Sequence, residues 1–128
     1  EEEFRLKFIP SGFMSAGELS IEPAKKEIEA FSKRILRMYD FIPELFDLDD
    51  DKKFEQLMSR THKYEEITDR MELEIANYLT KVSENGMSLG ASQEISAMLR
   101  IVDNLESIGD SCYQLSLTIE SKRKQNIS

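Results

Sequence analysis

Three long stretches of this 128-residue sequence repeat their apolar residues in steps of three and four. Such steps place the apolar side chains along one face of an α-helix. In the first stretch these residues are Ala24, Ile28, Phe31, Ile35, Met38, Ile42 and Leu45. In the second they are Phe54, Leu57, Tyr64, Met71, Ile75, Tyr78 and Val82, and in the third Ile95, Met98, Val102, Leu105, Cys112, Leu115 and Ile119. The pattern therefore predicts three amphipathic helices, each burying one face.

The first predicted helix has a start signal and a stop signal. Ser20 stands where an N-cap serine is expected, because its hydroxyl can accept a hydrogen bond from the first turn. Pro43 lacks a backbone N–H, so we expect the helix to kink or end there. The acidic segment "DLDDD" (47–51) then forms a loop and places carboxylates at the start of the next helix.

The second and third predicted helices are separated by a segment rich in Gly and Ser. We expect the second helix to cover about residues 52–83, with Thr61 and Thr68 as polar interruptions of its apolar stripe. "ENGMSLGAS" (84–92) then breaks the chain, and Ser92 is the expected cap of the third helix. The breaks near 47–51 and 84–91 therefore divide the chain into three helices of similar length.

Helices of roughly 30 residues are each about 45 Å long. Three such helices with short connections predict an all-α fold, an antiparallel up-down-up three-helix bundle. We assign residues 20–128 to this bundle and residues 1–19 to an extended leader.

The leader alternates apolar and basic residues in "FRLKFIP" (4–10), which is typical of an extended segment. We expect Phe4, Leu6, Phe8 and Phe13 to lie at a contact, either across the bundle or with a second chain. Because aromatic side chains rarely stay uncovered in such numbers, a homo-oligomer is expected.

The composition excludes several classes of protein. With 17 Lys and Arg against 25 Asp and Glu, the net charge is −8, which disfavours binding to nucleic acid. The longest uncharged run, residues 8–17, has ten residues, whereas a membrane span needs about 20 apolar ones. This chain is therefore not expected to insert into a membrane by itself.

Its single cysteine excludes an internal disulfide. Because the chain opens with Glu rather than Met, we expect it to be part of a longer protein.

Two acidic segments share one spacing. "EEITDRME" (65–72) lies in the second predicted helix and "DNLESIGD" (103–110) in the third. In each segment three acids recur in steps of three and four, which places them on one helical face. They are Glu65, Asp69 and Glu72 in the first segment and Asp103, Glu106 and Asp110 in the second. Asp69 lies 15 residues before the second break and Glu106 14 residues after it, so on antiparallel helices the two groups lie at about the same height.

Carboxylates from two adjacent helices predict a cation site. Oxygen ligands suit hard ions, so the expected cofactor is a divalent or trivalent metal: Mg²⁺, Ca²⁺, Mn²⁺ or iron. Gly109 lies between Glu106 and Asp110 and would let a neighbouring backbone or a ligand approach. The alternative is a solvated acidic face in a protein that is acidic throughout.

No catalytic arrangement is visible in the sequence. The helical di-iron oxidases need a Glu-x-x-His motif, but Ser59 stands three residues before the only histidine, His62. Cys112 belongs to the apolar stripe and is expected in the core, while Ser107 and Ser111 have no histidine within a helical turn to activate them. We therefore predict that the chain is not an enzyme.

"DNLESIGD" and "EEITDRME" together resemble the PhoU family of phosphate-signalling proteins. The third-helix signature of that family reads close to Asp-x-Leu-Glu-Arg-Ile-Gly-Asp, and its second helix carries a Glu/Asp-x-x-x-Asp motif. The matching residues are Glu65, Asp69, Asp103, Leu105, Glu106, Ile108, Gly109 and Asp110. The resemblance implies a three-helix bundle and metal binding by Glu65, Asp69, Glu106 and Asp110. Asp103 and Glu72 lie one helical turn away and are expected as outer-shell groups. Ser107 replaces the signature arginine.

A single bundle resembles the C-terminal cytoplasmic domain of bacterial sodium/phosphate cotransporters. "FRLKFIP" followed by "GELSIEPAKKEI" is similar to the segment that joins the last membrane helix to that domain. The resemblance implies a non-enzymatic regulatory domain on the cytoplasmic side of the cell membrane, with the membrane portion of the same transporter as its partner. The alternative is a free-standing PhoU-like adaptor that docks on a sensor kinase or a transporter ATPase.

Overall fold

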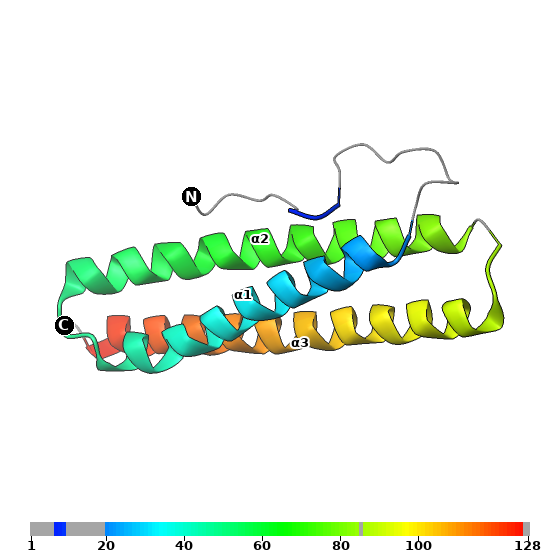
Figure 1. Cartoon of the computed structure of the whole chain (residues 1–128). Coiled ribbons are helices and arrows are strands. Elements are labelled where there is room, and N and C mark those ends of the chain that lie inside the picture. Colours follow the sequence, from blue (N-terminus) through cyan, green and yellow to red (C-terminus); the bar gives the residue numbers. More distant parts are fainter. Residues whose placement is uncertain (1–6, 10–19, 85, 127–128) are drawn as a thin grey trace.

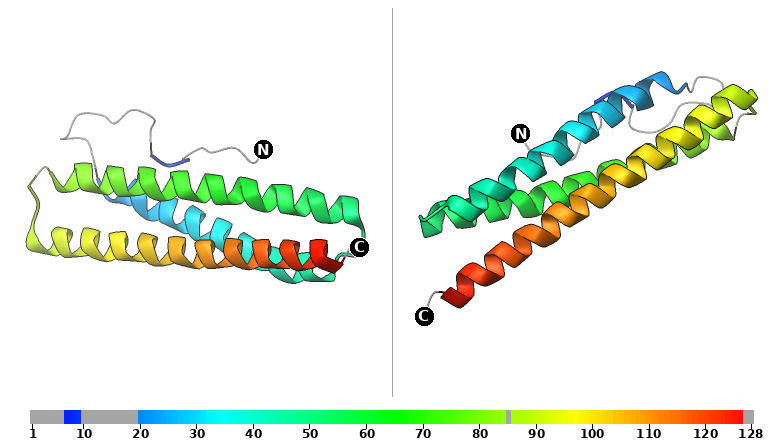
Figure 2. Two further views of the ribbon diagram at one scale, coloured as in Figure 1. Left: turned by 180° about the vertical axis from the view of Figure 1, so that it is seen from behind. Right: turned by 90° about the horizontal axis from the view of Figure 1, so that it is seen from below.

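The computed structural model describes residues 7–9, 20–84 and 86–126, and in this part of the chain the regular structure is three α-helices. They are α1 (Glu22–Asp47), α2 (Asp51–Ser83) and α3 (Leu89–Asn126). Figure 1 shows α2 and α3 side by side and antiparallel, with α1 crossing both of them. The two further views in Figure 2 agree, and all three helices pack against one another. The predicted all-α, up-down-up bundle is confirmed.

The core is formed by the faces that carry the apolar stripes. The largest fully buried apolar side chains are Tyr78, Phe31, Phe41, Met38, Leu45, Met71, Ile75, Leu79 and Val102. Thr61 and Thr68, the polar interruptions of α2, are also buried. Their hydroxyls donate to the carbonyls of Leu57 and Tyr64, at 2.8 and 2.9 Å, so neither is left without a partner.

Ser20 does not cap α1, contrary to the expectation. The residue before the helix is Ile21, which makes no side-chain capping bond. The backbone of Ser20 is instead held by α2, because its N–H donates to the Tyr78 hydroxyl at 3.3 Å and its carbonyl accepts from the same hydroxyl at 2.8 Å. A tertiary contact has therefore replaced the local cap.

α1 continues beyond Pro43 to Asp47, so of the kink or end expected at this proline the end is wrong. The additional turn places Leu45 in the core, where it is 1% exposed. The N–H of Leu48 then donates to the Glu44 carbonyl at 3.0 Å and closes the helix. Burial of a leucine side chain contributes about 1.5–3 kcal/mol, which offsets much of the cost of the missing proline donor.

The caps of the other two helices differ in how well the sequence predicts them. At α2 the carboxylate of Asp50 accepts the backbone N–H of Lys53 at 3.0 Å, as expected of an acid at this end. At α3 the cap expected at Ser92 is wrong, because the helix already begins at Leu89. The Ser88 hydroxyl accepts from the N–H of Ala91 at 3.2 Å. A serine earlier in the same Gly- and Ser-rich segment has the capping role.

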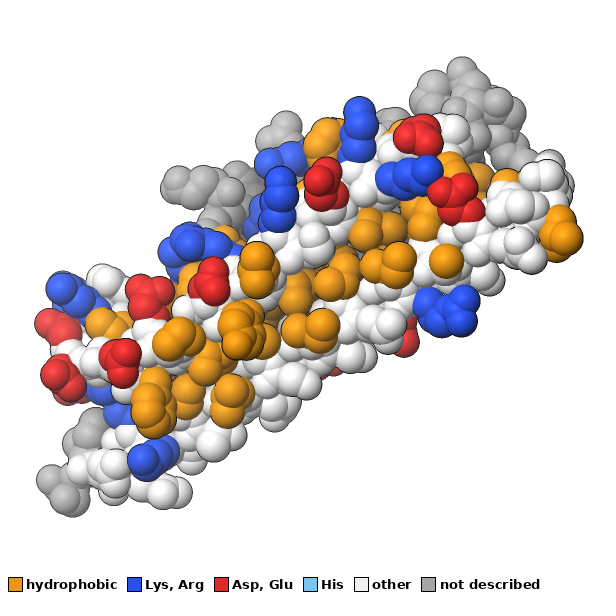
Figure 3. All heavy atoms as spheres, turned by 60° about the horizontal axis from the view of Figure 1, so that its bottom comes forward, with side chains coloured by type: hydrophobic (Ala, Val, Ile, Leu, Met, Phe, Trp, Pro, Cys, Tyr) orange, Lys and Arg blue, Asp and Glu red, His pale blue; other side chains and the backbone are white. Residues whose placement is uncertain are grey.

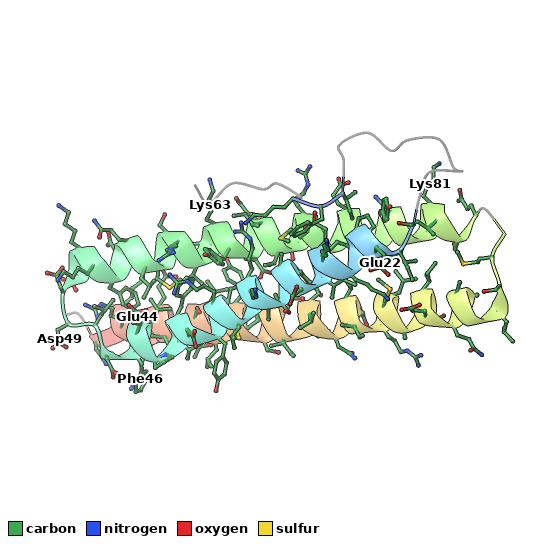
Figure 4. The ribbon with its side chains drawn as sticks, in the orientation of Figure 1. Glu22, Glu44, Phe46, Asp49, Lys63 and Lys81 are labelled. Atoms are coloured by element: carbon green, nitrogen blue, oxygen red, sulfur yellow. The ribbon has the colours of Figure 1, made fainter. Side chains whose placement is uncertain are left out.

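Arg123, near the end of α3, ties this helix to the turn between α1 and α2. Its guanidinium donates to the carbonyls of Leu48 and Asp49, at 2.7 and 2.9 Å, and to the carboxylate of Asp51 at 2.7 Å. It also lies 4.4 Å from the centre of the Phe54 ring. Figure 4 labels Asp49 in this turn. The contacts close one end of the bundle.

An apolar groove of about 730 Å³ runs between α1 and α3. Figure 3 shows hydrophobic side chains gathered along one face of the molecule. Tyr39 and Phe46 of α1 and Ile108 and Leu115 of α3 line it, and Phe46, labelled in Figure 4, is 67% exposed. Leu115, expected on the buried stripe, is 48% exposed and faces this groove instead.

Most of the predicted leader lies outside the described residues. Phe4, Leu6 and Phe13 belong to that part, and self-association through them stays a prediction. Of the described leader residues, Phe8 is 43% exposed, whereas Ile9 is buried against the core.

Gly109 allows α1 to pack closely on α3. A Cβ atom built on this buried glycine would lie 2.7 Å from Cδ1 of Ile35, which is too close for two carbon atoms. The neighbour that needs the space is therefore a side chain of α1, and the expectation that a ligand approaches there is wrong.

The contact predicts coupling between positions 109 and 35. Gly109→Ala brings its methyl against Ile35 Cδ1, whereas Ile35→Val removes that atom and leaves room for the methyl. We expect Gly109→Ala to be less favourable in the wild type than in the Ile35→Val background, by about 1 kcal/mol in unfolding free energy. Chemical denaturation of the four proteins of this cycle measures the difference. Additive effects would show that the contact relaxes freely.

Candidate metal site

Glu65 and Asp69, one turn apart on α2, meet Asp110 of α3. One carboxylate oxygen of each lies within 4.8 Å of the other two. The expectation that the acidic segments lie at the same height on antiparallel helices is therefore confirmed for these three residues. With Glu106 they are called the acidic cluster below.

Glu106 lies beside this group but contributes no oxygen to it. Its carboxyl group is within hydrogen-bonding reach of Asp110 and of Asp69. The structure thus brings three of the four predicted ligands together and places the fourth in contact with two of them. Glu106 as a direct ligand stays a prediction.

Partial burial and then like charges raise the pKa values of three members of the acidic cluster, Glu65, Asp69 and Glu106. Burial raises the pKa of Glu65 to about 8, helped by a hydrogen bond with Asp110 and the charges of Asp69, Asp110 and Glu106. The pKa of Glu106 rises to about 7, again from burial first and then from Asp110. The pKa of Asp69 is raised by burial and by the charge of Asp110. The cluster therefore retains protons near neutral pH, because its members cannot all ionise at close range.

Glu72 extends the acidic face toward Asp103. The pKa of Glu72 is raised by burial and then by the charges of Asp103, Asp69 and Asp110. These charges reach Glu72 from both helices, and the outer-shell role of Glu72 and Asp103 stays a prediction.

The acidic cluster fits a hard cation. Oε1 of Glu65 is buried and has no hydrogen-bond partner among the described residues. Ca²⁺ holds its oxygen ligands at about 2.3–2.6 Å, so oxygens up to about 5 Å apart can share one ion. A cation would satisfy the unpaired oxygen and replace the protons that the carboxylates now share.

The other residues with reactive groups have structural roles in the described part of the chain. His62 Nδ1 lies 2.6 Å from the Tyr113 hydroxyl and links α2 to α3. Cys112 is buried as expected, and burial raises the pKa of its thiol. Ser107 and Ser111 line the apolar groove.

Sequence reasoning missed Glu27. This residue of α1 is fully buried, and one of its carboxylate oxygens accepts the backbone N–H groups of Phe8 and Ile9. A signal was available, because Glu27 stands three residues after Ala24 and four before Phe31, on the buried stripe itself. The neighbouring Ile28, which was assigned to the stripe, is only partly buried.

Residues 28–119 match the model of the PhoU domain, which covers most of the chain. That family is regulatory and non-catalytic, and it acts in phosphate homeostasis. No curated protein and no solved structure matches the chain. Among the described residues, no helix has the length and apolar character needed to cross a lipid bilayer.

The raised pKa of Glu65 predicts how stability depends on pH in the absence of metal. From about pH 4.5 to about pH 8 the folded protein binds more protons at the acidic cluster than the unfolded chain does, so the cluster's contribution to stability falls as pH rises. Glu65→Gln removes the part of this dependence that comes from Glu65. We expect the variant to unfold at a higher temperature than the wild type at pH 8, and the difference to shrink toward pH 5.

Thermal unfolding in a buffer with a chelator measures this effect, and Glu66→Gln, an exposed neighbour on α2, is the matched control. If wild type and Glu65→Gln show parallel profiles, the carboxyl group of Glu65 does not hold a proton in the folded state.

Proposed function

Since the chain belongs to the PhoU family, we propose that it is a regulatory domain whose acidic cluster binds a metal ion, and that it controls phosphate uptake. The observation that carries the metal site is the meeting of Glu65, Asp69 and Asp110 from two helices, with a buried oxygen of Glu65 left unpaired.

The ligand chemistry favours an ion that prefers oxygen. The cluster offers only carboxylates, which suit Mg²⁺, Ca²⁺, Mn²⁺ or iron, and no cysteine or histidine belongs to the group. Glu65, Asp69 and Asp110 would hold the ion. Rotation of the Glu106 side chain would add a fourth carboxylate, and Glu72 and Asp103 would fix the first ligands from outside.

An ion at this place changes the charge of the face that α2 and α3 share. Without metal the cluster combines repelling carboxylates with shared protons, and with metal its charge is largely neutralised. A partner that contacts this face would therefore meet a different surface in the two states. Such a change provides a regulatory signal without any catalytic step.

We also propose that the domain belongs to a sodium-dependent phosphate transporter and lies on its cytoplasmic side. The similarity of "FRLKFIP" and "GELSIEPAKKEI" to the segment that precedes such domains supports this context. A free-standing adaptor remains the competing arrangement.

Metal binding predicts a specific gain in stability. An ion present at roughly a hundredfold excess over its dissociation constant raises the unfolding free energy by about 2.7 kcal/mol. We expect Mn²⁺, Mg²⁺, Ca²⁺ or iron to raise the unfolding temperature of the wild type but not of Asp69→Asn/Asp110→Asn. In chelator, that variant should be more stable than the wild type, because two repelling charges are gone.

Asp40→Asn/Asp47→Asn removes the same number of charges from exposed positions of α1 and should respond to metal as the wild type does. Equal metal-induced shifts of the unfolding temperature in all three proteins would show that the acidic cluster is only a solvated surface. The shift should also fade as pH falls, since protons compete for the same oxygens.

The transporter context predicts membrane spans in the complete gene product. The sequence encoded upstream of Glu1 should contain stretches of about 20 apolar residues, and the full-length protein should sediment with membranes. A complete gene product without such stretches would favour the free-standing adaptor.

A further inference from the structure

A second polar site lies between α1 and α2, away from the acidic cluster. It is a pocket of about 280 Å³, called the basic pocket here, whose lining includes Lys7, Glu27, Lys33, Arg34, Arg37 and Tyr64. Four of these six side chains are cationic, in a chain whose net charge is −8. The concentration of positive charge at one place points to an anionic ligand.

The two arginines of the basic pocket are held in place without forming ion pairs. The guanidinium of Arg34 lies 5.7 Å from the centre of the Tyr64 ring, and that of Arg37 lies 5.6 Å from the Phe41 ring. The two rings pack edge to face, with centres 5.2 Å apart. Within the described residues neither arginine, nor Lys33, forms an ion pair. Aromatic contacts thus position the guanidiniums while their N–H donors stay available.

Glu27 requires a hydrogen-bond donor from the ligand, whereas the cations of the basic pocket require negative charge. Its side chain is fully buried and lines the same pocket. Oε2 accepts the N–H groups of Phe8 and Ile9, whereas Oε1 is buried without a hydrogen-bond partner. A buried acceptor without a donor is costly, so the ligand that fits this pocket should bring a hydrogen to Oε1.

A ligand that is both an anion and a hydrogen-bond donor meets these requirements. Sulfate carries no proton at neutral pH, and a phosphate monoester, with a second pKa of about 6, is mostly a proton-free dianion. Inorganic phosphate keeps at least one P–OH group. We propose that the basic pocket binds inorganic phosphate, with Lys33, Arg34 and Arg37 on its anionic oxygens and its P–OH donating to Glu27 Oε1.

The charges in the basic pocket are compatible with this ligand. Glu27 repels an anion, but the three α1 cations and Lys7 outnumber it. Guanidinium groups also match phosphate oxygens in geometry. The proposal uses none of the residues of the acidic cluster, so its test is independent of metal binding. It would give a phosphate-regulating domain direct contact with the ion whose level it reports.

The test is a titration of the chain with sodium phosphate, sodium sulfate and methyl phosphate at pH 7 in chelator, followed by calorimetry and by the NMR signals of the arginine side chains. We expect phosphate to bind more tightly than the other two anions. Arg34→Gln/Arg37→Gln should weaken phosphate binding by roughly tenfold or more, since two charge-assisted bonds are lost. Lys52→Gln/Lys53→Gln, with the same loss of charge outside the pocket, should bind as the wild type does.

Glu27→Gln tests the selectivity. Its amide supplies a donor where the carboxylate supplied only an acceptor, so the preference for phosphate over sulfate should disappear. If this variant does not fold, the preference of the wild type for phosphate over sulfate still tests the proposal. Equal binding of phosphate and sulfate by the wild type, or equal weakening in the Lys52/Lys53 variant, would overturn the proposal. Asp69→Asn/Asp110→Asn should bind phosphate normally, which separates this result from that of metal binding.

Discussion

The packing of α2 against α3 forces carboxylates together, and the chemistry of the molecule depends on that constraint. α2 and α3 pack together through a core in which Ile75 and Val102 are buried, and this packing holds Glu65 and Asp110 close together. The free energy of the core thus opposes the repulsion between the acids. Burial is the main cause of the raised pKa of Glu65, and the charges of Asp69, Asp110 and Glu106 add to it, so protonation relieves both effects in the folded chain without an ion.

The three contacts between helices produce three surfaces of different chemistry. The acidic cluster lies between α2 and α3, the basic pocket between α1 and α2, and the apolar groove between α1 and α3. Each helix contributes to two of them, so its sequence has to satisfy two neighbours as well as the core. Ser107 lines the apolar groove while Glu106, the residue before it, belongs to the acidic cluster. The proposed metal ion and the proposed phosphate ion would therefore bind at separate places on one small bundle.

The helices and their order could be predicted from the sequence, because apolar periodicity is a local signal and the breaks are rich in Gly, Ser and Asp. The matching positions of the two acidic segments along the bundle axis could be predicted from the antiparallel arrangement of the helices. Contacts between distant segments could not be predicted. Ser20 looks like a cap until Tyr78 binds its backbone, and Gly109 looks like an opening until Ile35 fills the space beside it. Glu27 lies on a buried stripe, but its partners come from the leader.

The contacts of Arg123 have a consequence for the order of folding. The arginine and the Leu48 carbonyl are 75 residues apart in the sequence, with nearly all of α2 and α3 between them. Closing so long a loop in a disordered chain is entropically unfavourable, whereas the ends meet at little cost once α2 and α3 have paired. We therefore expect these bonds to form after the transition state. Interactions of that kind leave the folding rate nearly unchanged and slow the unfolding of the native molecule, so the C-terminal turn of α3 governs how long the bundle persists rather than how fast it forms.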